Sequence, residues 1–139
     1  MEILNDPSRV YNMNGSSFAV VPSKQKVIVP RGAKSVQSVS RNSEKENYMV
    51  LMSVSAAGKL APPLILFPYK SQLAPSIPKG RGMGRSDSGW MNSVAFNEFT
   101  VNVFYPWAVS EKLHFPILLF VDGHSSHASF NTVNFCREK

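Results

Sequence analysis

The sequence predicts an α/β domain built on a mixed sheet that is flanked by helices. Short extended segments rich in aliphatic and β-branched residues fill the first half of the 139-residue chain, and helical periodicity begins only near residue 92. A continuous apolar segment, residues 117–121, separates two helical patterns. Strands followed by a helix, a buried strand and a second helix are the order of an α/β layout. The length and the 43% hydrophobic content fit a single domain over residues 1–139.

Short strands are predicted in the N-terminal part. Residues 10–13 and 17–21 are expected to form a hairpin, because Asn14-Gly15 between them is a strong two-residue turn signal. Residues 26–29 and 34–41 are expected to be extended, and the second is expected to pair antiparallel with a strand over Asn47–Ser55.

The middle of the chain combines a turn, a strand and a loop. Ala57-Gly58-Lys59 predicts a turn, and the apolar residues 64–67 predict a further strand. Pro and Gly are frequent after it, so an irregular segment is expected to continue to Gly89.

Two helices are predicted in the C-terminal part, on either side of a buried strand. Asn92 or Ser93 is expected to cap the first helix, whose apolar residues recur at helical spacing. The unbroken apolar run at 117–121 predicts a strand covered on both faces. Ser125 or Ser126 is expected to cap the last helix. The apolar residues of the two helices are Val94, Phe96, Phe99, Val103, Phe104 and Trp107, then Phe130, Val133 and Cys136.

The strongest candidate for a functional site follows the apolar strand. Asp122 would stand at the carboxyl end of that strand, where α/β sheets place ligands, and Gly123 would permit a sharp turn. A carboxylate there suits a metal ligand, with a structural cap as the alternative. His124 and His127 could form a zinc pair, but the chain has only three histidines and no Cys or Glu at a helpful spacing. Hydrogen bonding by these histidines that shapes the loop under Asp122 is therefore favoured.

The basic residues are clustered. The formal net charge is +6, and no acidic residue occurs between Asp6 and Glu44. A second basic group lies in the Pro/Gly-rich segment before Gly89. Such clustering suits the phosphate backbone of a nucleic acid, and a basic solvated surface is the alternative. The candidate backbone contacts are Lys24, Lys26, Arg31, Lys34, Lys79, Arg81 and Arg85.

Several classes of protein are not expected. No apolar stretch approaches the roughly 18 to 20 residues that span a bilayer, so no membrane partner is predicted, and the N-terminus lacks the pattern of a secretory signal. The lone Cys136 cannot form an internal disulfide, which fits an intracellular compartment. It is predicted to be a packed helix residue rather than a nucleophile.

Four segments, in order, resemble one family. Residues 10–18, 52–67, 88–92 and 121–127 are similar to blocks of the DDE superfamily endonucleases derived from pogo, Tigger and Jerky type transposases. The resemblance covers nearly the whole chain. It implies a ribonuclease H-like fold in which three acidic residues hold two divalent metals, normally Mg²⁺ or else Mn²⁺, for DNA strand cleavage and transfer.

The resemblance also implies a degenerate catalytic site. Asp122 matches the second acid, whereas Asn14 stands where the family has the first, and the family's Asp-Glu pair is replaced by Asn14-Gly15. The third acid is expected beyond Lys139, so the domain is expected to be incomplete at its C-terminus.

A DNA-binding protein with impaired catalysis is therefore the favoured function. The resemblance and the charge imply a nuclear location, and the incomplete sheet suggests homo-oligomers formed through an exposed edge. The alternatives are a non-enzymatic protein-interaction or chromatin-associated module, and an active nuclease completed by further C-terminal sequence.

Overall fold

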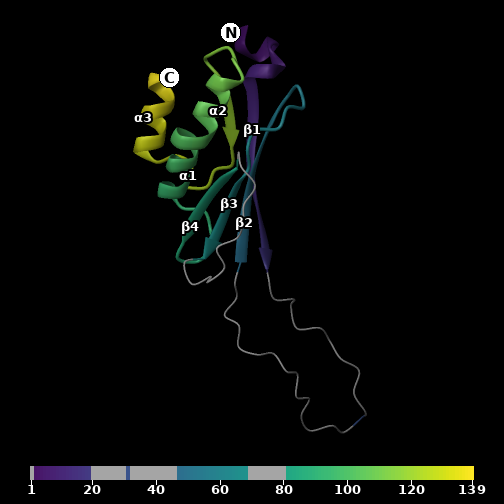
Figure 1. The fold of residues 1–139 in the computed structure, drawn as a ribbon, viewed down its shortest axis with the longest axis vertical. Helices are drawn as coiled ribbons and strands as arrows, with labels where there is room; N and C mark the ends of the chain where they lie inside the picture. Colours follow the sequence, from purple (N-terminus) through teal and green to yellow (C-terminus); the bar gives the residue numbers. More distant parts are fainter. Residues whose placement is uncertain (1, 20–30, 32–46, 69–80) are drawn as a thin grey trace.

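A five-stranded mixed sheet forms the centre of the molecule (Figure 1). The computed structural model describes residues 2–19, 31, 47–68 and 81–139. The extended pieces predicted at 26–29 and 34–41 lie outside the described residues, as do Lys24, Lys26, Lys34 and Lys79.

The sheet has the strand order β4-β3-β2-β1-β5. β1–β2 and β2–β3 are antiparallel, whereas β3–β4 and β1–β5 are parallel, which confirms the predicted mixed sheet. Two short 3₁₀ turns, Glu2–Asn5 and Pro7–Arg9, precede it. The strands are β1 (Val10–Ala19), β2 (Asn47–Ser55), β3 (Leu64–Pro68), β4 (Gly82–Ser86) and β5 (Leu118–Val121).

The hairpin predicted at Asn14-Gly15 is wrong, because β1 runs straight through both residues. Asn14 pairs with Met52 and Gly15 with Leu51 of β2. The Asn-Gly pair is a local turn signal, and here long-range pairing outweighs it. Gly15 instead makes room for Met49, since a Cβ at this position would collide with the Met49 methyl group.

β2 and β3 occupy the predicted positions, but β4 lies inside the segment predicted to be irregular. Its glycines hide the strand pattern, because glycine weakens a strand and carries no side chain to alternate. Gly82 has a packing reason: a Cβ there would lie 3.2 Å from Phe99 and 3.3 Å from Leu64. The close approach of helix and sheet therefore favours a residue that β propensity disfavours.

The predicted first helix is present and is widened in its middle. α1 (Ser93–Phe99) begins at Asn92, whose side chain accepts a hydrogen bond from the Ala95 N–H at 2.8 Å, as predicted. It continues through a π-helical turn, η3 (Thr100–Phe104), into α2 (Tyr105–Ser110).

The last helix, α3 (Phe130–Glu138), has a different cap from the one predicted. Ser129, and not Ser125 or Ser126, accepts a hydrogen bond from Thr132 N–H at 3.3 Å. Ser126 is engaged elsewhere, with its hydroxyl 2.8 Å from His124 Nδ1. None of the helices in the described part of the chain is long and apolar enough to cross a membrane.

The labelled helices α1, α2 and α3 gather on one side of the sheet (Figure 1). The core lies between them and alternate residues of the strands, including Tyr11, Met13 and Leu66. β5 was predicted to be covered on both faces, and this is wrong. It lies at the edge of the sheet, and Phe120 and Val121 are 50% and 38% exposed. The described helices cover one face only, so the other face of β5 stays open.

Gly89 provides a test of the turn between β4 and α1. Its φ is +73°, and a Cβ would collide with the carbonyl oxygen of Asn47. We expect Gly89→Ala to lower the free energy of unfolding by about 1–3 kcal/mol, because both the backbone conformation and the contact become strained. Urea unfolding followed by circular dichroism measures this loss.

Gly123→Ala is the matched control. Gly123 does not adopt a positive φ, and no atom lies within 4 Å of the place that a Cβ would take there. We expect this variant to stay within about 0.5 kcal/mol of the parent. Equal losses in the two variants would contradict the steric explanation.

Candidate functional site

The sheet brings Asn14 and Asp122 together. The parallel register of β1 and β5 ends with Met13 opposite Val121, so the next residues along the two strands are Asn14 and Asp122. Neighbouring strands are about 4.8 Å apart. Two positions more than a hundred residues apart in the sequence thus become neighbours at one edge of the sheet.

Two groups from the following loop contact the Asp122 carboxylate. Its Oδ1 accepts a hydrogen bond from the His124 N–H at 3.1 Å and lies 2.6 Å from His127 Nδ1. The hydrogen bond from the His124 backbone is the main cause that lowers the pKa of Asp122 below 3.8; desolvation opposes it, and His127 adds a smaller lowering effect. Asp122 is therefore ionised at neutral pH.

His127 ties this exposed carboxylate to the core. The side chain of Asp122 is 58% exposed, whereas that of His127 is 4% exposed and packs on Phe96 with ring centroids 4.5 Å apart. The His127 N–H donates to the His124 carbonyl at 3.0 Å and closes the loop. Neither ring nitrogen of His127 has a hydrogen-bond partner of good geometry among the described residues, so its short contact with Asp122 is an ion pair whenever the imidazole is protonated.

The two histidines are not arranged as a zinc pair. Their ring centroids are 5.9 Å apart, and His124 Nδ1 faces the Ser126 hydroxyl. Within the described ranges, no group of three or more His, Cys, Asp or Glu side chains could hold a metal ion. The zinc alternative therefore lacks a third ligand in this part of the chain.

The donor set at Asn14 and Asp122 does not fit a two-metal centre. Two adjacent divalent cations require several carboxylates to balance their charge. Here Asp122 supplies one negative charge, and its Oδ1 already contacts His124 and His127. Asn14 can offer only a neutral amide oxygen. The described residues alone thus provide too little charge to hold two such ions.

The basic candidate that belongs to the described sheet, Arg85, lies away from the strand that leads to Asp122. Three of the candidate phosphate contacts are among the described residues, and all three are exposed: Arg31, Arg81 and Arg85. Arg85 belongs to β4, at the opposite edge of the sheet from β5, where it lines a polar hollow together with Asp87 and Glu98. The β4 arginine thus lies across the sheet from the strand that leads to Asp122.

Arg9 was not singled out from the sequence. Its guanidinium donates two hydrogen bonds to the Pro116 carbonyl, at 3.0 and 2.9 Å, and so fastens the start of β1 to the segment before β5. No sequence signal links two residues so far apart, since the contact depends on the parallel pairing of these strands.

The sheet topology and flanking helices define a ribonuclease H-like α/β fold of the kind found in transposases. Solved structures of Mos1 transposase share it. The paired-end complex with left transposon end has a TM-score of 0.55 at 10% identity, over 95% of this chain and 33% of that chain. The mariner paired-end complex with Mn has a TM-score of 0.54 at 12% identity, over 96% and 34%.

The chain spans about a third of the length of the Mos1 chains that it matches. No protein-family model matches it, and neither does any curated protein. At 10–12% identity the likeness concerns the fold, and the roles of individual residues must come from the geometry of this chain.

His127→Phe tests the ion pair, because phenylalanine can keep the contact with Phe96 but has no ring nitrogen next to Asp122. We expect the pKa of Asp122 to rise toward 3.8, measured from the pH dependence of its ¹³Cγ chemical shift. A lowered folded-state pKa stabilises the fold above pH 3.8, and this stabilisation is lost as the pH falls through the lowered value. Acid should therefore destabilise the variant less in this window.

His124→Ala is the control for this experiment. It keeps the backbone N–H that donates to Asp122 and leaves His127 in place. We expect a smaller change in the pKa of Asp122 than in His127→Phe. An unchanged Asp122 pKa in His127→Phe would show that the imidazole does not stabilise the carboxylate.

Proposed function

We propose that this chain is a transposase-derived DNA-binding domain in which the DNA-cleaving site is impaired. The observation that carries the proposal is the fold shared with Mos1 transposase over 94–96% of this chain. The Mos1 structures include a complex with a transposon end and a pre-cleavage transpososome. The net charge of +6 supports a polyanionic partner as well.

Descent from the pogo, Tigger and Jerky type of DDE endonucleases is a finer proposal. It depends on the four sequence segments, and on Asp122 at the place of the second acid. A nuclear location follows from the same resemblance and from the basic charge.

DNA would be held through its phosphate backbone. The exposed Arg81 and Arg85 can pair with phosphates in any sequence context, because such contacts read no base. Binding by charge releases counterions and therefore weakens as salt is added.

Arg81→Glu combined with Arg85→Glu should weaken DNA binding. If each arginine neutralises one phosphate, the slope of log K against log salt should become shallower by about 2 units in total, since each phosphate contact contributes about 0.9. Fluorescence anisotropy of a labelled duplex at several KCl concentrations measures both affinity and slope.

Lys112→Glu combined with Arg137→Glu is the matched control, because it changes the net charge equally at exposed positions elsewhere. We expect a smaller effect on the slope. Equal effects would mean that β4 is not a DNA contact. If the parent chain does not bind DNA, or binds it with an affinity that does not depend on salt, DNA binding through phosphate contacts is contradicted.

A second candidate function, a protein-interaction module, is favoured by the open face of the sheet. Apolar side chains from four strands are exposed there, and β4 and β5 both present a free edge among the described residues. A second copy of the chain could pair with such an edge. Sedimentation as a dimer without salt-dependent DNA binding would favour this function. The exposed side chains are Phe18, Met52, Val54, Met83 and Phe120.

We expect the impaired site to bind divalent metal ions weakly and a single substitution to raise its affinity. Asn14→Asp places a second carboxylate beside Asp122, so we expect its affinity for Mn²⁺ to rise at least about tenfold over the parent, as measured by isothermal titration calorimetry. Asp122→Ala in the same background should abolish the gain. An Asn14→Asp variant with the parent's affinity would contradict the adjacency of the two side chains.

Plasmid nicking distinguishes the impaired site from an active nuclease. We expect no Mg²⁺- or Mn²⁺-dependent nicking by the parent chain, because too few carboxylates are assembled. Nicking that Asp122→Ala abolishes would instead mean that the site at Asp122 is an active nuclease despite Asn14.

A further inference from the structure

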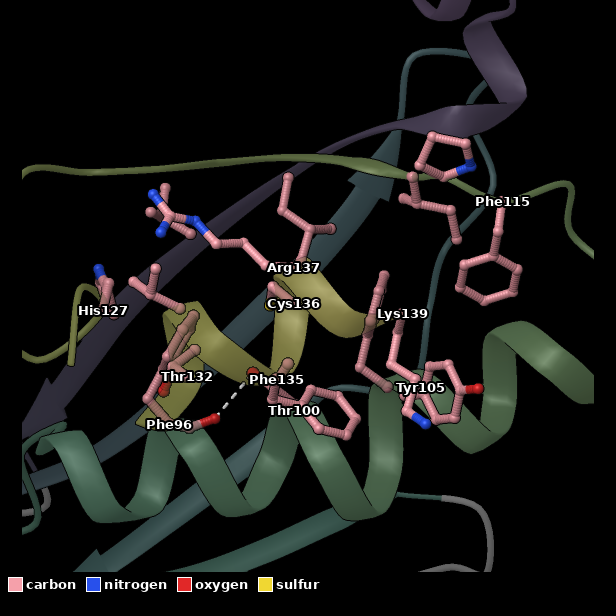
Figure 2. A pocket seen from close by; sticks show the side chains of 16 residues that line it. Phe96, Thr100, Tyr105, Phe115, His127, Thr132, Phe135, Cys136, Arg137 and Lys139 are labelled. Carbon is pink, nitrogen blue, oxygen red and sulfur yellow. Dashed lines mark hydrogen bonds between the residues drawn. The ribbon is translucent and has the colours of Figure 1, made fainter. Parts of the chain in front are cut away.

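An apolar pocket of about 300 Å³ separates α3 from the edge of the sheet. Figure 2 shows His127 at one end of it and Phe115 with Tyr105 at the other, with side chains of α3 between them. The volume is at the lower end of the range for small-molecule sites. The pocket is distinct from the arginines at β4 and from the open face of the sheet.

The walls of the pocket are mainly apolar. Leu119 and Val121 of β5 lie on one side, and Val133 of α3 lies on the other. Tyr105 closes the far end through edge-on ring contacts with Phe115 and Phe135, with centroids 5.6 and 5.4 Å apart. An alkyl chain or a flat aryl ring in this pocket would be in contact with carbon atoms of both walls.

The hydroxyl groups of the two threonines that line the pocket already have partners. Thr100 Oγ1 donates to the Phe96 carbonyl at 2.9 Å, drawn as a dashed line in Figure 2. Thr132 Oγ1 donates to Asn97 Oδ1 at 3.2 Å. Because these groups do not require water, an apolar ligand could displace solvent from the pocket without breaking their hydrogen bonds.

The lining carries two basic side chains and no acidic one. Arg137 and Lys139 line the pocket, and no Asp or Glu does so among the described residues. Glu138 lies between them in the sequence but is not part of the lining. Arg137 has no ion pair within the part of the chain that the structure describes, while Lys139 Nζ lies 5.8 Å from the centre of the Tyr105 ring. A guanidinium without a partner suits a carboxylate, which it can bind through two parallel hydrogen bonds.

We propose that this pocket binds a small amphipathic organic anion, a medium-chain alkyl or aryl carboxylate. The apolar body of the ligand lies between β5 and α3, and its carboxylate pairs with Arg137. Charge decides among ligands of similar shape, because a cation would be repelled by Arg137 and Lys139, and a neutral molecule would gain no ion pair with Arg137. A nucleic-acid phosphate carries no apolar group to fill the space between the walls.

Cys136 also lines the pocket and could provide a local readout. Cys136 was predicted to be packed, and this is wrong, because the residue is exposed. Desolvation by neighbouring groups still raises the pKa of its thiol, so it is a weak nucleophile at neutral pH. An apolar ligand that covers it should therefore slow its alkylation still further.

The test uses the 139-residue chain with octanoate as the probe and octan-1-ol as the neutral analogue. Methyl NMR spectra should show saturable shifts at Leu119, Val121 and Val133, with octanoate binding at least about tenfold more tightly than octan-1-ol. Arg137→Gln should remove this preference and leave octan-1-ol binding unchanged. Equal affinities of the parent for the two probes, or unsaturable shifts, would overturn the proposal.

Val133→Trp tests occupancy of the pocket by filling it. We expect loss of octanoate binding, whereas Val94→Trp on α1, whose side chain is 64% exposed and outside the lining, should bind like the parent. Circular dichroism checks that both variants are folded. If Val133→Trp does not fold, the loss of the octanoate preference in Arg137→Gln becomes the deciding test. Octanoate shifts at Phe18 and Met52 in place of the pocket methyls would assign binding to the open face of the sheet and would overturn the proposal.

Discussion

The pairing of β1 on both of its edges is the constraint on which the rest of the structure depends. β2 lies antiparallel along it from Tyr11 to Ala19, and β5 lies parallel to its first residues. This pairing keeps Asn14-Gly15 extended and sets Tyr11 and Met13 toward the helices. The position of β5 in turn sets the position of Asp122, because the loop that carries it begins where the parallel register ends.

The sequence predicted those elements whose signals are local. β2 and β3 are segments rich in apolar residues between turn signals, and the Asn92 cap involves residues within one turn of the helix. β4 was missed because its glycines serve packing against Phe99 rather than strand propensity. The exposure of β5 could not be predicted either, because an apolar run does not reveal whether one face of the sheet or both will be covered.

The adjacency of two candidate residues could be inferred from the sequence only through the resemblance. The resemblance singled out Asn14 and Asp122, and the strand register makes them neighbours. The burial of His127 against Phe96 depends on how the loop packs on α1, which no spacing of residues encodes. The same holds for the pocket, since its walls come from β5, α3 and the helix that runs from α1 to α2. Among the described residues, Arg85 on β4 and Asp122 after β5 lie at opposite edges of the sheet.

The π-helical turn η3 constrains which insertions and deletions the chain can tolerate. Phe96, Thr100, Phe104 and Ala108 are all buried, so buried residues recur every fourth position. In a regular α-helix such a row drifts by about 40° per step, because four residues exceed one turn of 3.6. The wide turn, closed by the Tyr105 N–H on the Thr100 carbonyl, absorbs this drift and keeps the row facing the sheet. Deleting one residue within η3 would leave eleven steps from Phe96 to Ala108, about 1,100° of regular α-helix and within about 20° of three full turns, so Ala108 would still face the core. Inserting one more residue would instead rotate α2 by about 100° relative to α1 and turn Ala108 away from the core.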